Sequence, residues 1–272
     1  MQAPFPALAR WLGCLCLAAG LSGCLIQVGA FHLFDQDVVA SAAQTFCERR
    51  VPGTVRDPAR SVLGDACNLS SRVIAHGGDM QQLAAIAYLE AARAHGPADL
   101  SLINGGGVRT DFPGQDLFAD PGFTDITVAE VYDALPFRNT LVRLTLSGAQ
   151  LKTALEDGLD YLVRTPGNTG AYPYAAGLRF DVNLGAQRGS RLSNVQVRNG
   201  AGMYVALDPA ATLRLVTSAY LASGGDGYDA LTGALRQDLP LEEADQLLWY
   251  VRNRTPLQRP AIGDYSTQAF TD

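Results

Sequence analysis

The pattern of apolar and polar positions along the chain predicts helices and strands in mixed order. Apolar residues recur at helical spacing over 79–93 and predict an amphipathic helix that ends near the Gly-Pro pair at 96–97. A short apolar run at 100–103 predicts a strand, which leads directly into the glycine-rich loop NGGGVR at 104–109. A helix followed by a strand and a glycine loop is the first unit that the pattern predicts.

Two sites have the spacing of a capping box, in which a hydroxyl side chain and an acid or amide three residues later bind the first backbone N–H groups of a helix. Thr127 with Glu130 predicts a short helix. It should stop before Pro136, because the residue preceding a proline avoids helical geometry. Ser147 with Gln150 opens a longer amphipathic helix.

Further strands are predicted at 140–146, 177–182, 192–198 and 212–218, and a last helix covers about 242–252. These strands are joined both by hairpin-type turns and by helices. This favours an α+β fold with mixed β-sheets flanked by helices.

The domain organisation follows from where this pattern is clear. We expect one domain over 79–260, because the periodic elements lie there. Residues 25–78 are irregular and are interpreted as an N-terminal extension packed onto it, and 261–272 as a C-terminal tail.

Composition and charge limit the function classes. The chain has 272 residues, of which 47% are hydrophobic and 18% charged, as is ordinary for a packed globular protein. Its net charge of −6 argues against a nucleic-acid partner, which would need a basic face to neutralise phosphates. Any anionic ligand must therefore be held by a few local arginines.

The first 24 residues have the order of a secretion signal, with Arg10 followed by an apolar stretch at 11–21 that is too short to span a bilayer comfortably. The next residues complete Leu-Ser-Gly-Cys, which resembles a bacterial lipobox in which Cys24 is lipidated. With Leu25 after it in place of Asp, the pattern predicts a periplasmic lipoprotein anchored in the outer membrane. An ordinary cleaved signal peptide and an uncleaved anchor are the alternatives.

Cysteine usage points to one disulfide. Cys14 and Cys16 leave with the signal and Cys24 would carry lipid, so Cys47 and Cys67 remain. Two thiols in an oxidising compartment suggest a disulfide, and closing a loop of about 20 residues stabilises a fold by roughly 3 kcal/mol. Two buried free thiols are the alternative.

Several hydrolytic chemistries leave no trace in the sequence. There is no P-loop motif and no G-x-S-x-G nucleophile elbow. The 3 histidines, His32, His76 and His95, are widely separated, whereas a two-metal hydrolytic site needs several ligands that converge. We therefore expect no catalytic residues, no metal site and no cofactor in this chain.

The loop NGGGVR could hold an anion. Its three glycines permit positive φ and a close backbone approach, and Arg109 presents a fork of donors suited to a phosphate or carboxylate. The alternative is a tight turn with a solvated arginine.

Two aromatic segments could hold a nucleoside. In PFRN, Phe137 could stack on a base and the Asn139 amide could read a base edge, although a Phe after Pro is more often a core residue. In TSAYLASGGDGY, Tyr220 offers a second aromatic plate and Asp226 an acceptor for vicinal hydroxyls. Gly224 and Gly225 between them let backbone come close to a ligand.

These segments, in this order, resemble the C-terminal domain of the 5'-nucleotidase family. The resemblance covers about 79–255 and runs through NGGGVRTDF, ITVAEVYDALPFRNTLVRLTLSGAQLKTALEDGL, GAYPYAAGLRF and LDPAATLRLVTSAYLASGGDGY. It implies that Phe137 and Tyr220 clamp the base and that Asp226 accepts the ribose hydroxyls.

The resemblance also implies roles for the surrounding positions. Asn104 and Arg109 fall on the loop at the sugar and phosphate end, Asn139 on a base-reading position, and Gly170 on a backbone contact in GAYP. Arg138 departs from the family, because many members have glycine there.

A second family arginine has no match in register, and Arg72, two residues out, is the nearest candidate. We therefore expect a weakened phosphate clamp. A further departure is the family's N-terminal metallophosphatase domain, whose motifs do not occur in this sequence.

The resemblance therefore implies a nucleotide-recognition component in nucleotide catabolism, with the divalent metal held by a separate metallophosphatase chain. A non-catalytic nucleotide- or nucleoside-binding lipoprotein and a purely structural module are the alternatives. A self-sufficient hydrolase is the least expected.

Overall fold

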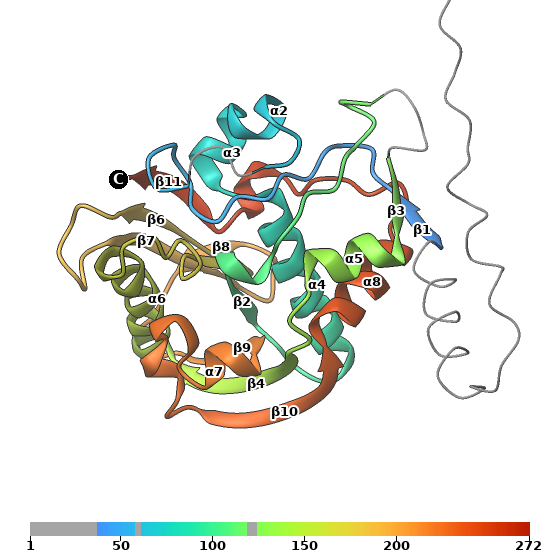
Figure 1. Cartoon of the computed structure of the whole chain (residues 1–272). Helices are drawn as coiled ribbons and strands as arrows, with labels where there is room; N and C mark the ends of the chain where they lie inside the picture. Colours follow the sequence, from blue (N-terminus) through green and yellow to red (C-terminus); the bar gives the residue numbers. More distant parts are fainter. Residues whose placement is uncertain (1–36, 58–60, 119–123) are drawn as a thin grey trace, which may run out of the picture. The chain divides into compact units, whose positions relative to one another are not determined.

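The structure, a computed structural model, describes residues 37–57, 61–118 and 124–272. The expected signal and lipobox at 1–24, with the lipidation site Cys24, lie outside these residues. Residues Asp37–Asp272 form one compact unit, so both 37–78 and 261–272 are part of it (Figure 1). In the described part of the chain, no helix is long and apolar enough to cross a membrane.

The centre of the fold is a mixed sheet of five strands in the order β10-β4-β9-β2-β5. Only β9 and β2 run parallel, and the other neighbours are antiparallel. This arrangement confirms the expected α+β class with mixed sheets. The strands are β2 (Leu100–Asn104), β4 (Thr140–Ser147), β5 (Pro173–Ala176), β9 (Thr212–Ser218) and β10 (Leu235–Glu242).

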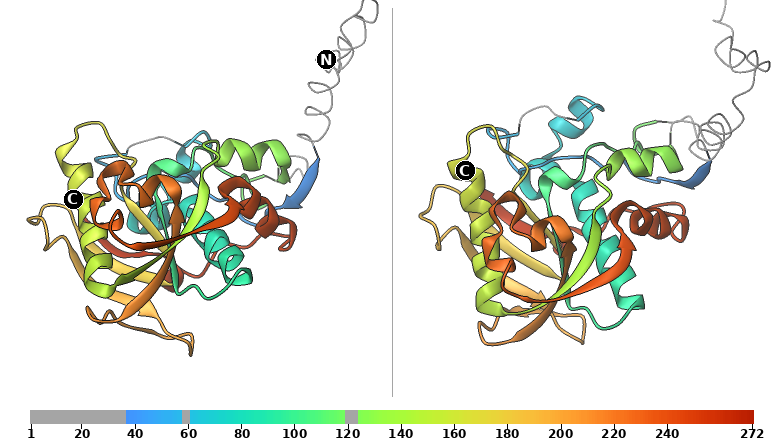
Figure 2. Two further views of the ribbon diagram at one scale, coloured as in Figure 1. Left: turned by 90° about the horizontal axis from the view of Figure 1, so that it is seen from below. Right: turned by 60° about the horizontal axis from the view of Figure 1, so that its bottom comes forward.

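Helices cover both faces of this sheet. α4 (Asp79–Ala94) packs against β2 and β5, and α6 (Gly148–Arg164) contacts β4 and β5. Figure 1 and Figure 2 show the two helices on opposite sides of the sheet. Every position of β2 is buried because both of its faces are covered.

Both expected capping boxes are present. Thr127 caps α5 (Val128–Ala134), which ends just before Leu135 and Pro136. Ser147 caps α6, and its hydroxyl accepts the backbone N–H of Gln150 at 3.1 Å. The apolar stripe of α6 packs inward, with Leu151, Leu155 and Leu159 fully buried.

A second sheet has four strands in the order β11-β6-β7-β8. The strands are β6 (Leu178–Asn183), β7 (Leu192–Arg198), β8 (Tyr204–Ala206) and β11 (Thr267–Thr271). β11 lies in the segment interpreted from sequence as a tail, and it pairs parallel with β6. Its Thr267 hydroxyl is 2.8 Å from the Tyr172 hydroxyl, which ties the C-terminus to the start of β5.

The N-terminal segment is attached through β1 (Val38–Ser41), which pairs antiparallel with β3 (Asp125–Thr127). It continues through the short helices α2 (Asp65–Asn68) and α3 (Ser71–His76). The remaining elements are α7 (Ala219–Ala222), α8 (Glu243–Arg252) and the 3-10 turns η1 (Gly105–Gly107), η3 (Gly225–Gly227), η4 (Asp229–Leu231) and η5 (Ile262–Asp264).

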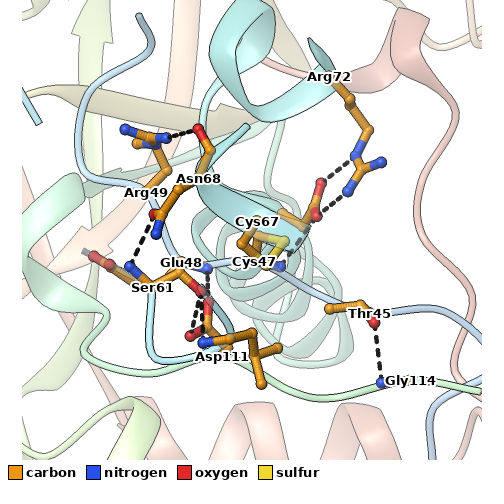
Figure 3. Close-up of a disulfide and its surroundings, with 12 residues drawn as sticks. Thr45, Cys47, Glu48, Arg49, Ser61, Cys67, Asn68, Arg72, Asp111 and Gly114 are labelled. Carbon is orange, nitrogen blue, oxygen red and sulfur yellow. Dashed lines mark hydrogen bonds and ion pairs between the residues drawn. A yellow bond between two sulfur atoms is a disulfide. The ribbon is translucent and has the colours of Figure 1, made fainter. Parts of the chain in front are cut away.

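A disulfide joins Cys47 to Cys67, with the two Cα atoms 5.5 Å apart, so the two residues are not free thiols (Figure 3). Next to it, the backbone N–H of Cys47 donates to Asp79 Oδ2 at 3.1 Å, and Arg72 binds the same carboxylate with two hydrogen bonds of 2.8 and 2.6 Å. The Tyr265 hydroxyl donates to Asp79 Oδ1 at 2.5 Å. The buried Asp79 at the start of α4 thus anchors the N-terminal segment.

Candidate functional site

Every strand of the five-stranded sheet brings a loop to the same edge, the one formed by the C-terminal ends of β2 and β9. The parallel strands β2 and β9 both end there, and the antiparallel β4 and β5 begin there. β10 is antiparallel to β4 and also ends at this edge. Loops from segments far apart in the sequence therefore meet at one place, which is where the sequence predicted the ligand-binding residues.

A pocket of about 610 Å³ lies at this edge. It is lined by Arg50, Asn104, Gly106, Gly107, Arg109, Phe137, Asn139, Gly167, Asn168, Thr169, Gly170, Tyr220, Asp226 and Glu243. The structure thus brings together seven predicted residues: Asn104, Arg109, Phe137, Asn139, Gly170, Tyr220 and Asp226. The predicted Gly224 and Gly225 do not line it.

Two exposed aromatic side chains line the pocket. Phe137 is 54% exposed and Tyr220 is 45% exposed, so neither is a core residue, although a core position was the alternative for Phe137. Gly225 sits under the Tyr220 ring, and a Cβ on it would come within 2.5 Å of that ring. Gly224 adopts φ 85°, a left-handed conformation that glycine favours. The role of these two glycines is to shape the turn beside Tyr220, and they do not contribute lining surface.

Asp226 is held between two neighbours by its carboxylate. The Asn104 amide Nδ2 donates to Oδ2 at 2.6 Å, and the Tyr220 hydroxyl donates to Oδ1 at 2.9 Å. Each carboxylate oxygen has two lone pairs, so the group keeps acceptor capacity for two further hydroxyl donors. Burial, and next the Asp226 charge, raise the pKa of Tyr220 to about 12, so its hydroxyl stays a donor at neutral pH.

Two arginines line the pocket. Arg109 follows the turn η1, and its guanidinium carbon lies 5.6 Å from the centre of the Phe137 ring, in a cation–π position. Arg50 comes from the N-terminal segment, and its Nε lies 3.6 Å from Glu48 Oε1. Because Arg50 is far in sequence from every motif of the pocket, the local pattern gave no signal for it.

Arg72, the nearest candidate in sequence for a second clamp arginine, lies elsewhere. Its guanidinium binds Asp79 at the start of α4, and Arg72 does not line the pocket. Arg50 and Arg109 both line the pocket, and the expected weakening of the phosphate clamp stays a prediction.

The glycines of the loop NGGGVR allow two backbone segments to come close together, and they do not adopt positive φ. Gly105, Gly106 and Gly107 form the turn η1, and none of them has positive φ. The backbone N–H of Gly106 donates to the Gly170 carbonyl at 2.9 Å, and a Cβ on Gly106 would come within 2.9 Å of Gly170 Cα. The loops after β2 and before β5 therefore touch through their backbones.

A buried carboxyl group also lines the pocket. Glu243 begins α8 and is 4% exposed, and its Oε2 accepts from Asn139 Nδ2 at 2.9 Å. Burial raises the pKa of Glu243 to about 7, and the bond from Asn139 opposes that rise. Sequence reasoning missed Glu243, because an acid in the first turn of a helix is ordinarily a surface residue.

Arg138 points away from the pocket that its neighbours line. Its Nε donates to Glu242 Oε1 at 3.0 Å, and its side chain is 69% exposed. Its backbone has φ 55°, the conformation for which glycine is the usual residue. Arg138 therefore occupies a left-handed turn position without placing its charge in the site.

The described residues were also considered as possible metal ligands. Within 37–57, 61–118 and 124–272, no group of three or more His, Cys, Asp or Glu side chains is placed to hold a metal ion. His76 Nδ1 lies 2.8 Å from the Thr267 carbonyl oxygen, in a structural contact with β11. With its aromatic rings, the Asp226 carboxylate and two arginines, the pocket can stack a planar ring, accept hydroxyl donors and pair with an anion.

Comparison with known proteins agrees with this geometry. The family profile described as "5'-nucleotidase, C-terminal domain" matches residues 61–233. A probable 5'-nucleotidase of Treponema pallidum is 35% identical over 162 residues, 58% of this chain and 26% of the relative. The NAD 5'-nucleotidase of Haemophilus influenzae is 36% identical over 152 residues, 55% of this chain and 23% of the relative.

A solved structure shares the fold over most of the chain. The 5'-nucleotidase precursor from Thermus thermophilus has a TM-score of 0.68 and 27% identity, over 91% of this chain and 41% of that one. The protein spans about a quarter of the length of the two curated relatives. Because the profile matches more than half of the chain, the protein belongs to the family of 5'-nucleotidase C-terminal domains.

Proposed function

We propose that this chain is the nucleotide-recognition component of a 5'-nucleotidase-type system, which presents nucleotides to a metal-dependent phosphatase on another chain. The observation that carries the proposal is the pair of half-exposed aromatic rings, Phe137 and Tyr220, on one pocket with Asp226 and two arginines. Rings that stack a base, a carboxylate that accepts ribose hydroxyls and cations that pair with phosphate match the three parts of a nucleotide.

The binding step is tested by calorimetric titration of the purified chain with AMP, UDP-glucose and adenosine. Phe137→Ala and Tyr220→Ala should each weaken binding by about 1 to 3 kcal/mol, the range for stacking a base on an aromatic ring. Trp249→Ala is the matched control, because this ring is 42% exposed but does not line the pocket. Absence of binding for all three ligands contradicts the proposal.

The division of labour is tested by phosphate release from AMP with an added divalent cation. We expect no release by this chain alone and release when a separately purified metallophosphatase chain is added. Metal-dependent release by this chain alone would refute the split. Tight binding with no release in any pairing would favour the alternative, a nucleotide-binding lipoprotein without a catalytic role.

We also propose that the protein is exported to the periplasm and anchored through Cys24. The support is the order of charge, apolar stretch and Leu-Ser-Gly-Cys at 1–24. Labelled palmitate should be incorporated into the wild-type chain and not into Cys24→Ser. Equal labelling of both chains would contradict lipidation at Cys24.

A further inference from the structure

Asn139 and Glu243 hold each other through two hydrogen bonds. Asn139 Nδ2 donates to Glu243 Oε2 at 2.9 Å, and the backbone N–H of Glu243 donates to the Asn139 carbonyl at 3.0 Å. Both residues line the pocket, because the start of β4, which follows Asn139, and the end of β10, which precedes Glu243, lie side by side. The side chain of Asn139 is therefore anchored by a partner 104 positions away.

The chemistry of this pair selects one orientation of the Asn139 amide. An ionised carboxylate can only accept hydrogen bonds, so it must face the amide nitrogen and not the amide oxygen. The other orientation would place two acceptor oxygens against each other in a buried position, where an unpaired polar group is costly. Oδ1 and the second N–H of Nδ2 are left for a ligand.

The ligand edge that this amide can meet follows from its place in the loop. Asn139 lies two residues after Phe137, and both line the pocket. A base stacked on the Phe137 ring thus presents an edge to the amide. An acceptor oxygen beside a donor N–H matches the N6 amino group and N7 of adenine, whereas a 6-oxo purine presents acceptors at both positions.

We propose that Glu243 is a positioning residue that sets the base preference of the pocket, favouring 6-amino over 6-oxo purines by holding the Asn139 amide in one orientation. This inference rests on the proposed function, because it needs a nucleoside in the pocket.

Protonation of Glu243 should let the Asn139 amide adopt either orientation and so remove the preference for 6-amino purines. Burial raises its pKa to about 7. Below that pH the carboxyl group can donate to Asn139 Oδ1, so the amide can turn and offer its N–H groups to a 6-oxo purine. The other titratable groups facing Glu243 are Tyr88 from α4, whose pKa burial raises well above its usual value, and Glu242, which pairs with Arg138.

The test measures the affinities for adenosine and inosine by calorimetry, at about pH 8 and about pH 5.5, on either side of the Glu243 transition. Nucleosides are used because a nucleotide phosphate titrates near pH 6 and would confuse the comparison. For the wild-type chain we expect a preference for adenosine of about tenfold at the higher pH and below about threefold at the lower pH, the scale of one misplaced hydrogen bond.

Glu243→Gln should remove both the preference and its pH dependence, because a glutamine amide can donate or accept at either pH. Asn139→Ala should also abolish the preference at both pH values, and it tests the inference independently of folding effects at position 243. Glu242→Gln is the control and should keep the wild-type preference at about pH 8, because Glu242 pairs with Arg138 and does not line the pocket.

The failure of this inference and the failure of the proposed function give different results. Equal affinity of the wild-type chain for adenosine and inosine at about pH 8, or a Glu243→Gln chain that keeps the wild-type ratio, overturns this inference and leaves nucleotide recognition standing. If the wild-type chain binds no nucleoside or nucleotide at all, the proposed function fails and the role of Glu243 fails with it.

Discussion

The hydroxyl of Tyr220 donates a hydrogen bond of 2.9 Å to Asp226 Oδ1, so one aromatic wall of the pocket is tied directly to its carboxylate. The backbone N–H of Asp226 donates to the same hydroxyl at 3.2 Å. The Tyr220 ring and the Asp226 carboxylate are therefore coupled within the short segment that runs from α7 to η3.

Asp226→Asn should weaken adenosine binding by about tenfold or more, because hydroxyl donors lose a charged acceptor. Asparagine tolerates the φ of 52° at this position, so the turn should be kept. The affinity for 2',3'-dideoxyadenosine, which has no vicinal hydroxyls, should change little in the same titration. An equal loss for both ligands would mean that Asp226 acts only by holding Tyr220.

Arg50→Ala should weaken AMP binding by about tenfold and leave adenosine binding unchanged, because a hydrogen bond to a charged group contributes about 1.5 to 3 kcal/mol. Arg236→Ala is the control, since this exposed arginine pairs with Asp238 and does not line the pocket. The measurement is the ratio of AMP to adenosine affinity. If adenosine binding falls as much as AMP binding, Arg50 supports the pocket wall and does not contact phosphate.

Replacing both Cys47 and Cys67 by serine should lower the free energy of unfolding by roughly 3 kcal/mol, as expected for opening a loop of this length. Urea denaturation of the wild-type and the double variant measures this difference. The AMP to adenosine affinity ratio should also fall, because Arg50 lies three residues after Cys47. An unchanged ratio would show that Arg50 is positioned without the disulfide.

The stability of the protein should decrease as pH rises through the titration of Glu48. Burial, with Asp57 as the next cause, raises the pKa of Glu48 from 4.5 to about 7. Between these values the folded chain binds a proton that the unfolded chain has released, so folding is favoured at the acidic end.

Glu48→Gln should therefore be more stable than the wild type at about pH 8, by an amount on the order of 1 to 3 kcal/mol, and close to it at about pH 5. Glutamine can still accept the hydrogen bond from Gln81 Nε2, which is 3.2 Å long in the wild type. Denaturant unfolding at both pH values gives the comparison. A stability difference that does not grow with pH would contradict the assignment.

The local elements of the fold were predictable, because their signals lie within a few residues. The capping boxes at Thr127 and Ser147 gave the starts of two helices, and the apolar runs gave β2, β7 and β9. The edge strand β10 escaped prediction, because it is mostly exposed and contains Pro240. Proline cannot donate to a neighbouring strand, and the pairing with β4 is irregular between Asp238 and Glu242.

The candidate site was predictable where a motif carried it and not where only the tertiary fold did. Phe137 lies in the motif PFRN, and Tyr220 and Asp226 lie in TSAYLASGGDGY. These motifs could be recognised in the sequence, so the place of the three residues in one pocket could be expected. Arg50 and Glu243 are ordinary residues in ordinary surroundings, and only the tertiary fold brings them there. β11 escaped for the same reason, because its partner β6 lies far away in the sequence.

The pocket combines residues from inside and outside the segment that matches the family profile. Its aromatic rings and Asp226 lie inside the segment 61–233 that matches the family, whereas Arg50 precedes that segment and Glu243 follows it. Under the two proposals above, substitutions at Arg50 and Glu243 would alter phosphate binding and base preference while every residue within 61–233 stayed the same. A comparison limited to 61–233 would then give the same result for chains that bind different nucleotides.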